Sequence, residues 1–308
     1  MRIAILDLGT NTFNLLIKDS NNDEVVFNGK IPVKLGEGGI SKGFIAEKAF
    51  ERGLDAMQNH VNTINQYKAT KILALATSAI RDAQNGPEFV QKVFQQTGIE
   101  IKTINGLLEA ELIAEGVAHA LQMPALPSLI IDIGGGSTEF IVCENGTVKW
   151  MNSYPLGVSR LLELFRPSDP ISTEEVLSLN EHFGTLLSDL DTAMQKWPSP
   201  VLIGSSGSFD TLADICILKA DSQAVPLNTP SYLFDLATYR LVEREILKST
   251  FEERLLIPGM LAMRADMIVL SCILIRYVLE RYSIKSMWLS KYALKEGAYF
   301  RLKSKGNV

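Results

Sequence analysis

The sequence reads Ile130-Ile131-Asp132-Ile133-Gly134-Gly135-Gly136-Ser137-Thr138 near its middle, and the earlier stretch Ile5-Leu6-Asp7-Leu8-Gly9-Thr10-Asn11-Thr12 has the same pattern. In each copy an apolar run ends in Asp-x-Gly, small and hydroxyl-bearing residues follow, and a second apolar run begins, at Leu15–Ile17 in the first copy and Phe140–Val142 in the second. A strand, a glycine turn and a returning strand form a hairpin, and backbone N–H groups gathered at such a turn bind phosphate. The repeat therefore predicts two domains that hold a phosphorylated ligand between them.

Strands and helices alternate in the half of the chain that contains the first copy. Apolar residues recur at helical spacing between residues 46 and 66, so one face of this helix is expected to be buried. The predicted strands are Arg2–Asp7, Asn14–Asp19, Val25–Phe27, Ile31–Val33, Lys71–Ala76 and Glu100–Ile104. The predicted helices are Ala46–Gln66, Pro87–Gln96 and Leu107–Leu121.

The half that contains the second copy repeats this plan. Its predicted strands are Leu129–Asp132, Thr138–Cys143, Thr147–Ser153, Pro200–Ile203 and Ser286–Leu289. Its predicted helices are Glu174–Lys196, Phe209–Ile217, Pro258–Arg281 and Ala293–Lys303. Two prolines between Met123 and Pro127 stop the preceding helix, which places the domain boundary there, with domains 1–125 and 126–308. Each half is then a hairpin-led mixed sheet covered by helices, an α/β domain, and the last helix is expected to pack back on the first domain.

Composition excludes several classes of protein. A length of 308 residues fits two domains, and a net charge of −5 argues against a general nucleic-acid binder. The three cysteines and three histidines are scattered, with no Cys-x-x-Cys pair, so neither a disulfide framework nor a zinc site is indicated. The apolar start at Met1–Leu6 is too short for a signal peptide, and the run Met267–Ile275 is too short to span a bilayer. We therefore expect a soluble, cytoplasmic protein with no membrane partner.

Three consecutive glycines, Gly134, Gly135 and Gly136, are the strongest local signal. Ordering them costs backbone entropy, so some close approach should account for them. A tight turn with positive φ would account for one glycine but not for three. Phosphate docking on exposed N–H groups is such a close approach, and Ser137 and Thr138 would add hydroxyl donors.

Asp7 and Asp132 each stand where an apolar strand ends. A carboxylate at such a place either binds its own backbone in the turn or holds a metal ion. Magnesium suits two carboxylates in equivalent positions, because it usually takes one or two carboxylates, several waters and the phosphates of the substrate. Glu139, at the start of the returning strand, is a further candidate ligand.

Two residues outside the repeats are candidates for catalysis. Arg81 lies in the segment Thr77–Asp82, which follows a strand, and either clamps a phosphate or forms a surface pair with Asp82. Glu109 lies in the first turn of the helix at 107–121, where it either complements the helix dipole or removes a proton from water.

Two further glycine-rich segments are candidates for the cleft. The loop Gly204–Ser208, with Ser206 and Gly207, precedes a predicted helix and would present backbone donors to a second anion or a nucleotide. The segment Gly36–Gly43 does not fit the P-loop pattern, and it is either a plain loop or a part of the cleft lining.

Five motifs fall in an order that resembles the exopolyphosphatase/guanosine pentaphosphate phosphohydrolase family, in its short two-domain form. They are Asp7-Leu-Gly-Thr-Asn-Thr12, Ala76-Thr-Ser-Ala-Ile-Arg-Asp82, Ile104-Asn-Gly-Leu-Leu-Glu-Ala110, Asp132-Ile-Gly-Gly-Gly-Ser-Thr-Glu139 and Pro155-Leu-Gly-Val-Ser-Arg160. The segments Arg264-Ala-Asp266 and Leu294-Lys-Glu-Gly297 extend the resemblance over nearly the whole chain. The family belongs to the superfamily of actin-like ATPases and sugar kinases, which implies two ribonuclease-H-like domains facing across a cleft that holds the ligand.

The resemblance also implies roles for individual residues. Glu109 corresponds to the glutamate that activates water, and Arg81 to an arginine of the cleft. Asp132 and Glu139 correspond to acidic residues near the metal, Mg²⁺ or Mn²⁺, and the attacking water. The two phosphate loops are implied to consist of Gly9, Thr10 and Asn11 and of Gly135, Gly136, Ser137 and Thr138. Asn14, Leu108 and Lys295 depart from residues that are frequent in the family.

The expected function is metal-dependent hydrolysis of the terminal phosphoanhydride of inorganic polyphosphate, of guanosine pentaphosphate, or of both, with release of orthophosphate. The alternatives are a small-molecule kinase of the same superfamily and a non-catalytic sensor of polyphosphate or an alarmone nucleotide. The sequence leaves open the preferred substrate and the oligomeric state, a homodimer being one option.

Overall fold

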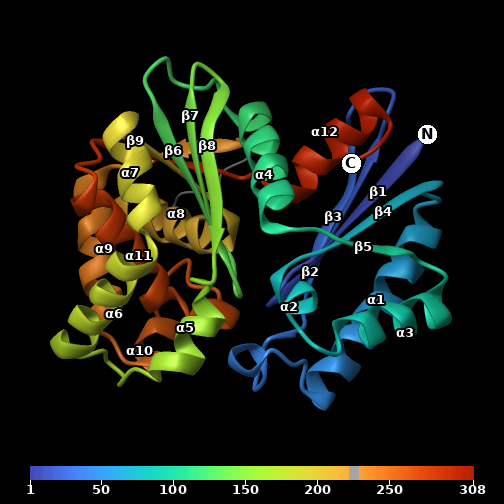
Figure 1. Ribbon diagram of the computed structural model, residues 1–308, viewed down its shortest axis with the longest axis horizontal. Helices are drawn as coiled ribbons and strands as arrows, with labels where there is room; N and C mark the ends of the chain where they lie inside the picture. The colour runs from blue at the N-terminus through green and yellow to red at the C-terminus, as the bar shows by residue number, and fades with distance from the viewer. Residues whose placement is uncertain (222–228) are drawn as a thin grey trace.

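The computed structural model describes residues 1–221 and 229–308. It contains two mixed β-sheets side by side, with helices on their outer faces and a helical layer between them (Figure 1). The helices α1 and α3 lie outside the first sheet, and α6, α9 and α11 lie on the far side of the second (Figure 1).

The first sheet has the strand order β3-β2-β1-β4-β5. The first three strands form an antiparallel meander, and β4 and β5 continue the sheet parallel to β1. The strands are β1 (Arg2–Leu8), β2 (Thr12–Asp19), β3 (Val25–Pro32), β4 (Lys71–Ala76) and β5 (Ile101–Thr103). The helices of this part are η1 (Ile40–Lys42), α1 (Glu47–Gln66), α2 (Ser78–Arg81), α3 (Gly86–Thr97) and α4 (Gly106–Ala120).

The second sheet repeats this topology. Read as β8-β7-β6-β9-β11, it has the same order and the same mixture of antiparallel and parallel pairs, and β10 adds one antiparallel edge strand. The strands are β6 (Ser128–Ile133), β7 (Thr138–Glu144), β8 (Thr147–Tyr154), β9 (Val201–Ser205), β10 (Ser231–Leu233) and β11 (Ser286–Ser290). The prediction of two α/β domains built on one repeated topology is confirmed.

The helices of the second half are more numerous than the sequence indicated. They are α5 (Val158–Phe165), α6 (Thr173–Leu186), α7 (Ser188–Lys196), α8 (Ser206–Ala220), α9 (Leu236–Lys248), α10 (Phe251–Leu255), η2 (Ala262–Arg264), α11 (Ile268–Arg281) and α12 (Leu294–Lys305). The predicted helix Glu174–Lys196 is two helices that meet at Leu187. The sequence did not indicate the break, because apolar residues keep helical spacing through it. The predicted helix Pro258–Arg281 begins regularly only at Ile268, since Gly259 has a φ of +92°.

Two glycines misled the prediction of strands and loops. The predicted pair of strands at 25–27 and 31–33 is one strand, β3. Gly29 lies in the middle of this strand under the ring of Phe27, and a Cβ on Gly29 would come within 2.7 Å of that ring. The predicted loop Gly204–Ser208 is the end of β9 and the start of α8. Gly204 is needed inside β9 because the Phe209 ring would lie 2.0 Å from a Cβ there.

The two sheets share a layer formed by α4 and α12. Side chains of both sheets, such as Ile5 of β1 and Ile130 of β6, belong to one buried cluster with Leu112 of α4 and Tyr299 of α12. The last helix packs against β1 and β2, and the predicted boundary at 125/126 falls between α4 and β6. No helix within residues 1–221 and 229–308 has the length and apolar character needed to cross a bilayer.

Candidate active site

A cleft of about 450 Å³ lies between the two domains. Both hairpin turns line it, together with the first turn of α4 and the start of α8. Most of the predicted site residues are brought together here. They are Asp7, Gly9, Thr10, Asn11, Glu109, Asp132, Gly134, Gly135, Gly136, Ser137, Ser206 and Gly207.

The two Asp-x-Gly turns close in the same way. The N–H of Gly9 donates to the carbonyl of Thr12 (3.1 Å), and the N–H of Gly134 donates to the carbonyl of Ser137 (3.0 Å). These two N–H groups are thus used inside their own turns. The backbone N–H groups of the next two residues in each turn have no acceptor within the described part of the chain. Each turn therefore presents unused donors to the cleft.

The three glycines allow the two turns to touch. None of Gly134, Gly135 and Gly136 has a positive φ. A Cβ on Gly135 would lie 2.7 Å from Nδ2 of Asn11 and 2.8 Å from Cβ of Thr10, and one on Gly136 would lie 2.4 Å from Oγ of Ser78. The close approach that the glycine run predicts is thus made, within the protein, by the backbone of the second turn and side chains of the first domain.

Thr138 and Glu139 lie below the surface of the cleft. The hydroxyl of Thr138 donates to the carbonyl of Leu156 (2.9 Å) and the residue is fully buried, so Thr138, predicted as a phosphate donor, does not line the cleft. Glu139 is 1% exposed, and its Oε1 accepts a hydrogen bond from Oγ of Ser153 (2.7 Å). Ser153 lies opposite Glu139 on the neighbouring strand.

Asp7 and Asp132 are each held by a neighbouring strand. Nδ2 of Asn14, opposite Asp7 in the β1–β2 ladder, donates to Oδ2 of Asp7 (3.0 Å). Oγ of Ser205, paired with Asp132 in the β6–β9 ladder, donates to Oδ2 of Asp132 (2.6 Å). These contacts fix both carboxylates at the floor of the cleft.

Burial and mutual repulsion raise the pKa values of the acidic side chains. Burial, offset in part by Lys295 and aided by the charge of Asp132, raises the pKa of Asp7 to about 6. Burial and the charge of Asp132 raise the pKa of Glu139 to about 7. Burial also raises the pKa of Asp132. Crowded, desolvated carboxylates of this kind are typical of functional sites.

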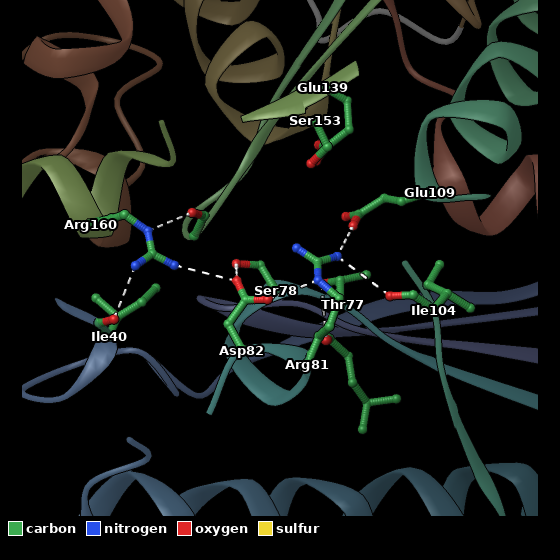
Figure 2. A network of polar contacts seen from close by, with 12 residues as sticks. Ile40, Thr77, Ser78, Arg81, Asp82, Ile104, Glu109, Glu139, Ser153 and Arg160 are labelled. Carbon is green, nitrogen blue, oxygen red and sulfur yellow. Dashed lines mark hydrogen bonds and ion pairs between the residues drawn. The ribbon is translucent and has the colours of Figure 1, made fainter. Parts of the chain in front are cut away.

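Arg81 and Glu109 form an ion pair at the edge of the cleft (Figure 2). Nη1 of Arg81 lies 3.0 Å from Oε2 of Glu109, and its Nε donates to Oδ1 of Asp82 (2.9 Å). Glu109 is 7% exposed, and burial, then the charge of Glu139, raises its pKa, while Arg81 lowers it. The pair with Asp82, one of the two alternatives for Arg81, is present, and Arg81 also binds the buried glutamate. The phosphate clamp stays a prediction.

Known proteins match the chain over nearly its full length. The model of the Ppx/GppA phosphatase family matches residues 16–305. The chain belongs to the Ppx/GppA phosphatase family. The crystal structure of an exopolyphosphatase from Cytophaga hutchinsonii superposes with a TM-score of 0.96 at 36% sequence identity, covering 100% of this chain and 99% of that one.

Two more proteins are similar to this Ppx/GppA member over nearly its full length. Exopolyphosphatase 1 of Mycobacterium tuberculosis is 27% identical over 309 residues, which span 98% of this chain and 88% of the relative. The structure of the Aquifex aeolicus member of the Ppx/GppA family has a TM-score of 0.81 at 24% identity, over 100% of this chain and 99% of that one, and shows the same fold.

In this Ppx/GppA member the cleft also has a mixed-charge half that sequence reasoning largely missed. Four basic residues line it with the carboxylates of Asp210 and Asp214; the basic residues are Lys30, Lys291, Lys295 and Arg264. Arg264 is 7% exposed, and its Nε has no hydrogen-bond partner among the described residues. Lys295 is partly buried, binds Glu296 at 2.9 Å and lies near the charge of Asp7.

The sequence held a weak signal for two of these residues. Arg264 and Lys295 occur in the segments that extend the family resemblance. Lys30, Asp210 and Asp214 had none. Lys30 falls between the two predicted strands, and the predicted helix Phe209–Ile217 contains Asp210 and Asp214 but does not show that they line the cleft. The glycine-rich segment Gly36–Gly43 does not line this cleft within the described residues; Gly36 and Gly38 line a separate cavity of about 250 Å³ between the domains.

Proposed function

We propose that this chain hydrolyses the terminal phosphoanhydride of inorganic polyphosphate and releases orthophosphate. One observation carries the proposal: Arg81 pairs with the buried Glu109 at a cleft lined by two turns that have unused backbone N–H donors. The relatives named exopolyphosphatase support the choice of substrate.

Different residues bind the substrate and activate the water. The free N–H groups of the two turns and the guanidinium of Arg81 hold the terminal phosphates and stabilise the negative charge that spreads over the transferred group. Glu109 orients a water molecule and takes its proton as the water oxygen bonds to the terminal phosphorus. The bond from that phosphorus to the bridging oxygen breaks, which yields orthophosphate and a chain one phosphate shorter.

The chemistry of the site fits a magnesium or manganese ion. Asp7 and Asp132 offer oxygen ligands at the floor, with Glu139 behind them. Burial raises the pKa of all three, and a bound cation would favour the charged forms that burial disfavours. No three His, Cys, Asp or Glu side chains converge on one ion within residues 1–221 and 229–308. We therefore propose that one or two of these carboxylates hold the ion together with waters and substrate oxygens. Bound there, it would neutralise the anhydride oxygens.

Guanosine pentaphosphate is the second candidate substrate, and the mixed-charge half of the cleft favours it. Asp210 and Asp214 would repel a polyphosphate chain, whereas carboxylates accept hydrogen bonds from the amino and imino groups of guanine. The lysines and Arg264 beside them would bind the other phosphates of such a nucleotide.

The decisive experiment measures phosphate release from short polyphosphate, long polyphosphate and guanosine pentaphosphate, with magnesium, manganese or EDTA. Release from polyphosphate that EDTA abolishes supports the proposal. Transfer from ATP to a hydroxyl acceptor, without release from polyphosphate, would show a kinase instead. Binding without release in either metal would show a sensor.

A further inference from the structure

Arg160 joins the two domains beside the Arg81–Glu109 pair. It lies in the first turn of α5, in the second domain, and its guanidinium reaches three groups (Figure 2). Its Nε donates to the carbonyl of Gly136 (3.0 Å) in the second turn, and its Nη1 donates to the carbonyl of Ile40 (3.1 Å) in the first domain. Its Nη2 lies 3.5 Å from Oδ2 of Asp82, also in the first domain.

Asp82 connects Arg160 to the Arg81–Glu109 pair. Its Oδ2 accepts a hydrogen bond from Oγ of Ser78 (3.0 Å), and its Oδ1 accepts one from Nε of Arg81 (2.9 Å). Arg81 in turn binds Glu109. A continuous series of contacts therefore runs from the second turn through Arg160, Asp82 and Arg81 to the carboxylate of Glu109.

The start of α5 is itself fixed to both turns. The N–H groups of Ser159 and Arg160 donate to the carbonyl of Gly135 (2.8 and 3.2 Å), and Oγ of Ser159 donates to Oδ1 of Asn11 (2.7 Å). Arg160 thus has little freedom at its own backbone. Its side chain can place Asp82 relative to the second turn because its base is held there.

Stability is not the main use of this contact. The Asp82 side chain is 42% exposed, and an ion pair with a partner exposed to this extent adds little to stability. The three acceptors lie in different directions, which suits the planar fork of an arginine and not the single ammonium of a lysine.

We propose that Arg160 is a positioning residue for hydrolysis. It holds Asp82 beside the second turn, and so keeps Arg81 on Glu109 when the two domains are together. This inference rests on the proposed function for its kinetic consequence, but its structural consequence can be measured without activity.

The kinetic test compares Arg160→Ala, Arg160→Lys and a matched control, Lys34→Ala. Lys34 also bridges the domains, through Asp266 (3.4 Å), but it lies at the separate cavity. We expect Arg160→Ala to lower kcat about 10- to 100-fold with KM changed less than about 3-fold, because misplacement of the catalytic pair costs rate. Arg160→Lys should recover little of the lost kcat, and added guanidinium ion should restore part of the kcat of Arg160→Ala. The kcat of Lys34→Ala should stay within about 2-fold of wild type.

A double-mutant cycle tests the path through Asp82. Asp82→Ala should lose about as much rate as Arg160→Ala, and the double variant should lose little more than either single variant. Additive losses would overturn the inference. So would a raised KM with unchanged kcat, which would make Arg160 a phosphate ligand, or an equal loss in Lys34→Ala, which would make any bridge between the domains sufficient.

Hydrogen exchange supplies the second readout. The N–H groups of Arg81 and Asp82 donate to the carbonyls of Thr77 and Ser78 at the start of α2. They should exchange faster in Arg160→Ala than in wild type or Lys34→Ala, and unchanged exchange would contradict the inference. If wild type releases no phosphate, the proposed function fails, while this exchange result still decides the role of Arg160. Should Arg160→Ala not fold, Arg160→Lys and Asp82→Asn remove the same link with smaller changes.

Discussion

Asn14 and Glu139 occupy equivalent positions in the two hairpins. Asn14 lies opposite Asp7 in the first ladder, and Glu139 lies opposite Asp132 in the second. The first aspartate therefore receives a hydrogen bond from an amide, whereas the second faces another carboxylate. The repeated fold thus has an asymmetric floor, with the excess negative charge on the side of the second domain.

Glu109→Gln should lower kcat about 10²- to 10⁴-fold, because the amide cannot take the proton of the water. Phosphate release measured at saturating polyphosphate gives the rate, and calorimetric titration should show that the variant still binds substrate. Glu111→Gln, on the same helix but bound to Arg301 on α12, is the matched control and should keep its activity. Wild-type turnover in Glu109→Gln would remove this residue from the mechanism.

Without a divalent cation, the protein should lose stability as the pH rises from about 4 to about 7. The pKa of Asp7 is about 6 in the folded protein against an ordinary 3.8, and that of Glu139 is about 7 against 4.5. Below the ordinary values both states are protonated. Between the two sets of values only the unfolded chain releases these protons, so rising pH favours unfolding.

Thermal denaturation in EDTA at pH 4.5 and pH 8 checks this. Magnesium should raise Tm by more at pH 8 than at pH 4.5, since it binds the ionised carboxylates. An equal effect of magnesium at both pH values would argue against a cation at Asp7 and Asp132.

Glu139→Gln should make the metal-free protein more stable at pH 8 and the enzyme less active. The change removes one of the crowded charges while the amide oxygen still accepts from Ser153. The expected result is a Tm several degrees higher in EDTA, together with a higher magnesium concentration for half-maximal phosphate release. A lower Tm in EDTA would show that the Glu139 carboxylate stabilises the fold by more than its repulsion with Asp132 destabilises it.

Gly135→Ala should destabilise the protein by about 1–3 kcal/mol, because the added methyl group would overlap Asn11 and Thr10. Gly184→Ala in α6 is the control, since the nearest atom to its Cβ is Oη of Tyr277 at 3.5 Å. It should be neutral or stabilising by about 0.5–1 kcal/mol. Urea denaturation of both variants measures the difference in their free energies of unfolding. Equal values would mean that the two turns move apart to accept the methyl group at little cost.

The repeat in the sequence was sufficient to predict both hairpins and the meeting of Asp7 and Asp132. Strand alternation and apolar runs are local signals, and they placed most strands of both sheets. Residues 156–221 and 229–267 were harder to predict, because their short helices and irregular turns follow from tertiary contacts such as that of Gly259 with the backbone of α8. Lys30 on β3 and Asp214 on α8 line the cleft because the two domains pack together, so no local pattern marks them.

The shared layer of α4 and α12 also limits how the chain can be divided. A cut between Met123 and Pro127 would leave the first sheet without the helix that covers β1 and β2, although that helix is the last element of the chain. The phenol of Tyr299 hydrogen-bonds Asp23 across the same boundary. Neither half, expressed alone, would keep a complete core, so the two domains are better regarded as one cooperative folding unit than as separable modules.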